Sequence, residues 1–114
     1  MSGLNRWVAL VNVGAETELR YTTSGQAVLN MRLAANEKYK TKEGETKEIV
    51  TWINGVVWGS RAEALSKMIA KGDRLYVEGA LRVSTYDDKE GVKRTKVEVE
   101  LREIEFVGGK RDAS

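Results

Sequence analysis

The sequence of 114 residues contains no cysteine, no histidine and no proline. Without cysteine and histidine, zinc fingers and knuckles, His-bearing metal sites, and Ser-His or Cys-His nucleophilic catalysis are excluded. Disulfides are excluded as well, and a chain of this length can bury a hydrophobic core without them. We therefore expect one domain with no metal and no cofactor.

Long hydrophobic runs are also absent. No apolar stretch approaches the roughly 20 residues that span a bilayer, and Met1–Arg6 lacks the apolar region of a secretory signal peptide. We therefore expect a soluble, intracellular protein with no membrane partner. The formal net charge is only +2, so charge alone does not indicate a nucleic-acid partner, and such binding must be argued from where the charges lie.

Hydrophobic alternation predicts a chain made mostly of strands. Long strands are expected over residues 5–13, 26–39, 47–58, 74–86 and 92–107, with a short extended piece at 19–21. Between the third and fourth long strands, Ser60 and Glu63 form an S-x-x-E capping box, and Lys71-Gly72 is expected to end the helix. Five strands with one helix in that place are typical of an OB-fold, an all-β, partly open Greek-key barrel. We expect this domain over residues 1–107 and a short flexible C-terminal end at 108–114.

The last two long strands also predict which side chains are buried. The alternation assigns to the core Leu75, Val77, Gly79, Leu81 and Val83 from the fourth strand, and Val97, Val99 and Leu101 from the fifth. The apolar parity then changes at Ile104 and Phe106, which indicates a bulge near Arg102-Glu103.

Two tryptophans stand six residues apart in the third strand. Since side chains alternate along a strand, Trp52 and Trp58 share one face and lie roughly 20 Å apart at about 3.3 Å per residue. The opposite face carries Ile49, Ile53 and Val57 and is apolar enough to be buried. Exposed rings at this separation suit the stacking of unpaired bases along a sheet. The alternative is that both rings belong to the core or to a subunit interface.

Several short segments together resemble the DNA-binding domain of the bacterial-type single-stranded DNA-binding protein (SSB) family, over residues 5–106. These segments are Asn5-Arg6-Trp7-Val8, Leu19-Arg20-Tyr21, Leu33-Ala34-Ala35-Asn36-Glu37, Trp58-Gly59-Ser60-Arg61-Ala62-Glu63 and Tyr76-Val77-Glu78-Gly79-Ala80-Leu81-Arg82. The resemblance implies an OB-fold that is not an enzyme. It also implies sequence-independent binding and protection of single-stranded DNA in replication, recombination or repair.

The resemblance further implies that bases stack on four aromatic side chains, which here are Tyr39, Trp52, Trp58 and Tyr86. Phosphate contacts are expected from ten cations, namely Arg6, Arg20, Arg32, Lys38, Lys40, Lys42, Arg82, Lys89, Lys93 and Arg94. Because many of them alternate with acidic residues, a solvated surface charge is the alternative for each. The family usually has further basic residues after Arg82, whereas this chain has Val83-Ser84-Thr85. We therefore expect the affinity to fall only shallowly with salt.

Self-association is also implied by the resemblance, as a homotetramer or at least a dimer joined through strand edges and sheet faces. The familiar acidic tail with a hydrophobic tip is missing from this sequence, which ends at Lys110-Arg111-Asp112-Ala113-Ser114. Many members of the family recruit replication and repair proteins through that tail, so the resemblance leaves this second role open for this chain. The implied location is the cytoplasm, in association with the nucleoid, and a phage or organellar origin stays open.

Two other classes of function compete with this interpretation. Carboxylates cluster at Asp87-Asp88 and over residues 98–105, and paired acids can hold Mg²⁺ for phosphodiester cleavage. However, the glutamates alternate with buried valines, and Asp is favoured in turns for conformational reasons. The second competitor is an OB-fold adaptor of a primosome or recombination complex, which would need fewer exposed aromatic side chains.

Overall fold

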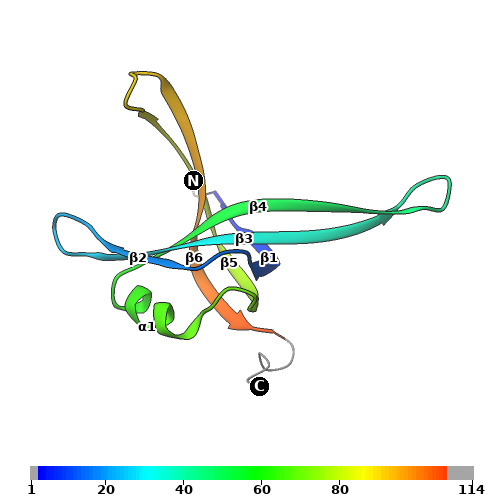
Figure 1. The fold of residues 1–114 in the computed structure, drawn as a ribbon, viewed down its shortest axis with the longest axis horizontal. Coiled ribbons are helices and arrows are strands. Elements are labelled where there is room, and N and C mark those ends of the chain that lie inside the picture. Colours follow the sequence, from blue (N-terminus) through cyan, green and yellow to red (C-terminus); the bar gives the residue numbers. More distant parts are fainter. Residues whose placement is uncertain (1–2, 108–114) are drawn as a thin grey trace.

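The structure is a computed structural model that describes residues 3–107, so the predicted flexible end at 108–114 lies outside the described residues. The elements in chain order are β1 (Trp7–Val13), β2 (Glu18–Tyr21), β3 (Ala27–Lys40), β4 (Thr46–Trp58), α1 (Ser60–Met68), β5 (Arg74–Asp87) and β6 (Lys93–Phe106). The short extended piece is β2, so the helix lies between β4 and β5 (Figure 1). The five predicted long strands and the helix between the third and fourth of them are confirmed.

The strands form one sheet in the order β1-β5-β6-β4-β3-β2, which closes on itself where β1 also pairs with β3. The closing contact joins Asn12 to Ala34 and Val13 to Leu33. β4 and β6 run parallel, while the other neighbouring strands are antiparallel. A five-stranded barrel with β2 added beside β3 is the predicted OB-fold.

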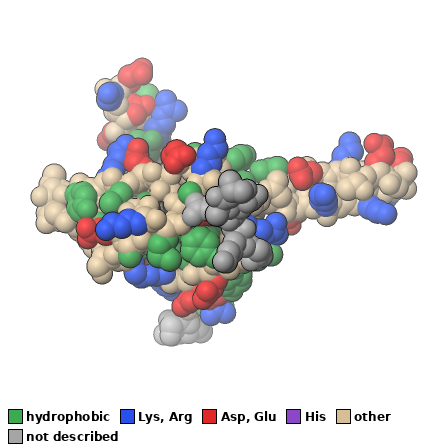
Figure 2. Space-filling model, turned by 60° about the horizontal axis from the view of Figure 1, so that its bottom comes forward, with side chains coloured by type: hydrophobic (Ala, Val, Ile, Leu, Met, Phe, Trp, Pro, Cys, Tyr) green, Lys and Arg blue, Asp and Glu red, His purple; other side chains and the backbone are tan. Residues whose placement is uncertain are grey.

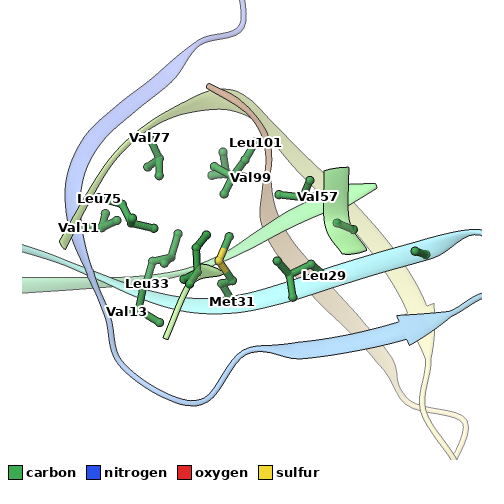
Figure 3. Packing of buried hydrophobic residues seen from close by; sticks show 13 residues of the cluster. Val11, Val13, Leu29, Met31, Leu33, Val57, Leu75, Val77, Val99 and Leu101 are labelled. Carbon is green, nitrogen blue, oxygen red and sulfur yellow. The ribbon is translucent and has the colours of Figure 1, made fainter. Parts of the chain in front are cut away.

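The barrel is filled by one hydrophobic cluster to which every long strand contributes (Figure 3). The largest fully buried side chains are Leu29, Met31, Leu33, Leu75, Val11, Val13, Val57, Val77 and Val99. α1 adds Ala62 from the helix itself, and Ile69 follows directly after it. Because alternate residues of β3 and β4 point into this core, the residues between them face outward. Some of these, such as Trp52 and Trp58, are exposed, whereas Ala34 and Val56 are buried.

Two hairpins extend beyond the barrel. The β3–β4 arm (residues 36–50) and the β5–β6 arm (residues 82–97) project in different directions (Figure 1), and nearly all of their residues are exposed. Leu81, Val83 and Val97 lie at or beyond the base of the second arm and are 37%, 61% and 41% exposed. Their predicted burial is therefore wrong, since the alternation continues past the point where the barrel provides a covering layer.

The predicted capping box does not form at the start of α1. Gly59 is the N-cap residue with φ 79°, and no side chain caps the helix. Glu63 instead accepts a hydrogen bond from the Tyr21 hydroxyl at 3.0 Å, which ties the helix to β2. This hydrogen bond raises the pKa of Tyr21. The helix also ends at Met68, before the predicted Lys71-Gly72.

The predicted bulge in the final strand is confirmed. Glu78 pairs with Glu103 and Gly79 with Leu101, which leaves Arg102 without a partner in the ladder. The extra residue keeps the apolar side chains before and after it on the inner side of the sheet.

Candidate nucleic-acid interface

Trp52 lies on the outward face of β4, opposite Ala34 of β3. Its side chain is 48% exposed. The guanidinium of Arg32 lies over the indole, 5.2 Å from the ring centroid, and Arg32 Nη1 donates a hydrogen bond to Asn54 Oδ1 at 3.1 Å. A cation over an aromatic face is attracted by the ring quadrupole. The indole is thus positioned by its neighbours while about half of it stays available to a flat ligand.

Gly14 provides the space into which the edge of this ring fits. A Cβ atom at this position would lie 2.5 Å from Cζ3 and 2.8 Å from Cη2 of Trp52. The backbone of Gly14 is fixed in turn, because its N–H donates to the carbonyl oxygen of Arg32 at 2.8 Å. The glycine therefore defines where the tryptophan ring can lie.

Trp58 lies at the end of β4 on the same outward parity, opposite Val28, and is 41% exposed. Neither of the two predicted stacking tryptophans belongs to the core, so their predicted exposure is confirmed. The inward residues between them include Val57, which is 1% exposed.

Tyr86 borders a groove between β4 and the β5–β6 arm. The groove has a volume of about 610 Å³ and is lined by Asn54, Ser84, Tyr86, Thr95, Lys96 and Val97. Asn54 is the residue that Arg32 contacts beside Trp52. The groove therefore connects the β5–β6 arm to the outward face of β4. Two of the predicted stacking rings, Tyr86 and Trp52, lie along this groove or next to its end at Asn54.

Tyr39 lies on the other side of the β3–β4 ladder. It pairs with Lys47, whereas Ala34 pairs with Trp52, so Tyr39 and Trp52 have opposite parity in the ladder. Its ring is 47% exposed because the arm has no covering layer. Tyr39 and Trp52 thus lie on opposite sides of the β3–β4 ladder, so the four predicted rings do not form one row along it.

Half of the predicted phosphate ligands are already engaged with carboxylates. The ion pairs are Arg6–Glu78 at 3.1 Å, Arg20–Glu18 at 2.8 Å, Arg82–Glu100 at 3.3 Å, Lys93–Asp87 at 3.9 Å and Arg94–Asp88 at 2.9 Å. Each of these cations is at least half exposed, and ion pairs at such exposed positions contribute little to stability. A phosphate would have to compete with the carboxylate at each of them.

The other predicted cations make no ion pair within residues 3–107. They are Arg32, Lys38, Lys40, Lys42 and Lys89. Three of these lysines belong to the β3–β4 arm or its turn, and Figure 2 shows basic and acidic side chains side by side on this arm. Of these five unpaired cations, three therefore lie on the β3–β4 arm, Arg32 lies over Trp52, and Lys89 lies in the turn of the β5–β6 arm.

The turn of the β5–β6 arm is organised by Asp88. Its carboxylate accepts hydrogen bonds from the N–H groups of Glu90 and Val92, each at 2.9 Å, and from Arg94 Nε at 2.9 Å. The backbone hydrogen bond from Val92 and the hydrogen bond from Arg94 lower the pKa of Asp88. This carboxylate is thus a structural group of the turn, and no group of three acidic side chains in the described part of the chain could hold a metal ion.

Sequence reasoning missed two residues of this face: Gly14 and Asn54. The parity that placed the two tryptophans on one face also placed Asn54 between them, so that signal was present. The closeness of Gly14 to Trp52 depends on how the barrel closes, which no local pattern reveals.

An OB-fold with exposed aromatic rings, a guanidinium over one of them and a lysine-bearing arm defines a class of proteins that bind single-stranded nucleic acid. The model of the "Single-strand binding protein family" matches residues 4–107, and the chain belongs to this family. "Single-stranded DNA-binding protein 1" from Xylella fastidiosa is 34% identical over 113 residues, covering 98% of this chain and 83% of the relative. "Single-stranded DNA-binding protein 1" from Chlorobaculum tepidum is 35% identical over 109 residues, covering 95% and 67% respectively.

Solved structures show the same architecture. A deletion mutant of the single-stranded DNA binding protein from Thermus aquaticus aligns with a TM-score of 0.81 at 28% identity, covering 95% of this chain and 52% of that one. The Plasmodium falciparum SSB complex with ssDNA aligns with a TM-score of 0.84, covering 95% of this chain and 98% of that one. At 24% identity the second likeness concerns the fold.

Proposed function

We propose that this protein binds and protects single-stranded DNA without sequence preference, in replication, recombination or repair. The observation that carries the proposal is the Trp52 cluster, in which Gly14 and Arg32 hold a half-exposed indole on the outer wall of an OB barrel. Every base has a face that can stack on such a ring, so binding is independent of sequence. Duplex DNA hides those faces, so single strands are preferred.

Stacking on Trp52, Trp58 and Tyr86 forms the central path, and Tyr39 is reached by a strand that wraps around the β3–β4 arm. Stacking of one base on one ring contributes about 1–3 kcal/mol. Phosphates are bound first by the unpaired cations Arg32, Lys38, Lys40, Lys42 and Lys89. The paired cations Arg6, Arg20, Arg82, Lys93 and Arg94 contribute less, because each must exchange a carboxylate for a phosphate. This supports a shallow salt dependence.

Neither competing function has support from the site. Members of this family are not enzymes, and Glu98, Glu100, Asp87 and Asp88 are each paired with a cation. An adaptor acting only through protein contacts would not need an indole seated over a glycine on the outer face.

Self-association is the second part of the proposal. Within the described residues, β1 pairs with β3 only at its end, so one edge of the strand is unpaired over residues 7–11. An unpaired edge invites another strand. Val8 and Leu10 are 47% and 48% exposed on the outer face of the same strand. We therefore expect a homotetramer, or a dimer as its building unit, and analytical ultracentrifugation measures which is present.

We propose the cytoplasm, in association with DNA, as the location of this function. In the part of the chain that the structure describes, no helix is long and apolar enough to cross a membrane.

The test is a tryptophan-fluorescence titration of the protein with oligo-dT, duplex DNA and RNA at two salt concentrations. We expect strong quenching by oligo-dT and little by duplex at the same nucleotide concentration. The logarithm of affinity should fall with the logarithm of salt by about 0.7 for each phosphate neutralised. Equal binding of duplex and single strands would contradict a stacking mechanism.

A further inference from the structure

A second hollow lies beside Trp58, at the point where β4 gives way to α1. It has a volume of about 490 Å³ and is lined by Gln26, Val57, Trp58, Arg61, Glu100, Leu101 and Arg102. Val57 and Leu101 are buried, at 1% and 4% exposure, while the Trp58 ring is 41% exposed. The hollow thus has an apolar floor, an accessible indole and a polar rim.

The rim carries an excess of positive charge. Its one carboxylate, Glu100, is in an ion pair with Arg82 at 3.3 Å. Arg61 and Arg102 are both exposed, and neither makes an ion pair or a side-chain hydrogen bond within residues 3–107. They differ in this respect from most of the other arginines in residues 3–107, and they lie where an anion would meet two guanidinium groups.

Both arginines are placed by irregularities of the backbone. Arg61 belongs to the first turn of α1, directly after Gly59 changes the chain direction with φ 79°. Arg102 is the residue that the β6 ladder leaves unpaired. Two unrelated features of the fold therefore bring a charge to the same hollow.

We propose that this hollow is a one-nucleotide subsite, in which Trp58 stacks a base and Arg61 and Arg102 bind the adjoining phosphate. The inference rests on the proposed function and extends it to residues outside the predicted phosphate ligands. Trp58 lies on the Trp52 face of β4, roughly 20 Å further along the strand, so a bound strand that follows β4 arrives at the hollow. The planar guanidinium group suits phosphate oxygens because it can donate two parallel hydrogen bonds.

The test compares two double variants with equal loss of charge. The first is Arg61→Gln with Arg102→Gln. The control is Lys67→Gln with Lys71→Gln, which removes two exposed cations that make no ion pair in the described residues, around the other end of α1. Both are made in a Trp52→Phe background, and fluorescence quenching by a long oligo-dT is measured over a range of salt concentrations.

We expect the arginine variant to lower the magnitude of the log–log salt slope by about 0.7, or about 1.4 if each arginine meets its own phosphate. It should also weaken quenching by oligo-dT, whereas the lysine control should keep both values. Equal slopes and equal quenching in the two variants, with oligo-dT still bound by the Trp52→Phe protein, would overturn the subsite alone. Failure of the protein without any substitution to bind oligo-dT would instead overturn the proposed function.

Acidic protein segments could also be attracted to two arginines, although they would have no use for the indole. Hexaglutamate is therefore titrated against the parent and the arginine variant. Binding of this peptide that is lost in the variant, with an unchanged salt slope for oligo-dT, would assign the hollow to a protein partner and overturn the nucleotide subsite. Absence of such binding supports it.

Discussion

The two arms continue four of the five barrel strands, β3 to β6, and yet they differ from the barrel. Inside the barrel, β3 alternates between fully buried residues such as Leu29 and Leu33 and outward ones such as Arg32. Beyond Ala35 the same strand continues with every residue exposed. The hydrogen-bonded ladder with β4 nevertheless runs without a break from Val28–Trp58 to Lys40–Thr46.

The comparison shows that a regular hydrogen-bonded ladder and a buried face are separate properties of a strand pair, although most strand pairs have both. The ladder fixes the backbone and the register, whereas burial on one side requires a second layer of structure. The arms have a regular ladder but no second layer that would bury one of their faces. Charged and aromatic side chains can therefore lie on both faces of an arm. In the barrel, only the outer face of each strand can carry side chains that bind a nucleic acid.

The largest expected effect is on the free energy of unfolding, when a core side chain is truncated. Leu33→Ala should lower the free energy of unfolding by about 2–5 kcal/mol, because Leu33 is 0% exposed and its loss leaves a cavity. Ile49→Ala, on the same parity of the arm ladder but 48% exposed, should cost about 0.5 kcal/mol. Chemical denaturation of both variants measures this contrast. Equal costs would mean that the arm is packed against another surface in solution.

The next effect concerns binding at the barrel wall. Trp52→Ala should weaken oligo-dT binding by about 1–3 kcal/mol, and Trp52→Phe should keep most of the affinity. Gly14→Ala leaves the indole in the protein but forces it aside, since the added Cβ would lie 2.5 Å from the ring. It should therefore give a smaller loss of affinity. Fluorescence anisotropy of labelled oligo-dT gives the affinities, and unchanged binding in Trp52→Ala would refute the stacking face.

A smaller effect distinguishes the two arms. Tyr86→Ala should weaken the binding of a short oligo-dT more than Tyr39→Ala does, because Tyr86 borders the groove that reaches Asn54. Tyr39 lies on the opposite parity from Trp52. With a longer oligonucleotide that can pass around the β3–β4 arm, the two losses should become similar. A greater loss for Tyr39→Ala with the short oligonucleotide would mean that the strand crosses the arm first.

The smallest effect is in the turn of the β5–β6 arm. The hydrogen bonds that lower the pKa of Asp88 stabilise the folded turn above the ordinary carboxyl range, and this contribution is lost as the pH falls through the lowered pKa. Amide hydrogen exchange at Glu90 and Val92 should therefore be protected near neutral pH and lose its protection in acid. Asp88→Asn should lack this pH dependence while the barrel amides keep their protection. An equal pH response in both proteins would show that Asp88 does not hold the turn.

Most of the fold could be predicted from the sequence because its signals are local. Alternation gave the strands, and the change of parity at Ile104 gave the bulge. The outward face of Trp52 and Trp58 followed from the same two-residue period. What this period cannot tell is whether anything covers the inward side, so Leu81, Val83 and Val97 were wrongly assigned to the core.

The remaining differences depend on residues that are distant in the sequence. Glu63 has the spacing of a capping residue, but its carboxylate contacts Tyr21, which is brought beside the helix by β2. The ion pairs that engage half of the predicted phosphate ligands likewise depend on register, as in Arg82 with Glu100. A local pattern identifies charges and leaves their partners undetermined.

The bulge in β6 has a consequence for how a strand can present a side chain. In an uninterrupted ladder each residue must point to one of two sides, so Arg102 would force Glu103 and Glu105 inward and Ile104 outward. Because β6 has one extra residue at the bulge, Glu103 and Glu105 stay outside and Ile104 packs against the core. Arg102 itself has no partner in the ladder, so its side chain does not decide whether the following residues point inward or outward. A mutation there is free to change surface charge without disturbing which way the rest of the strand faces.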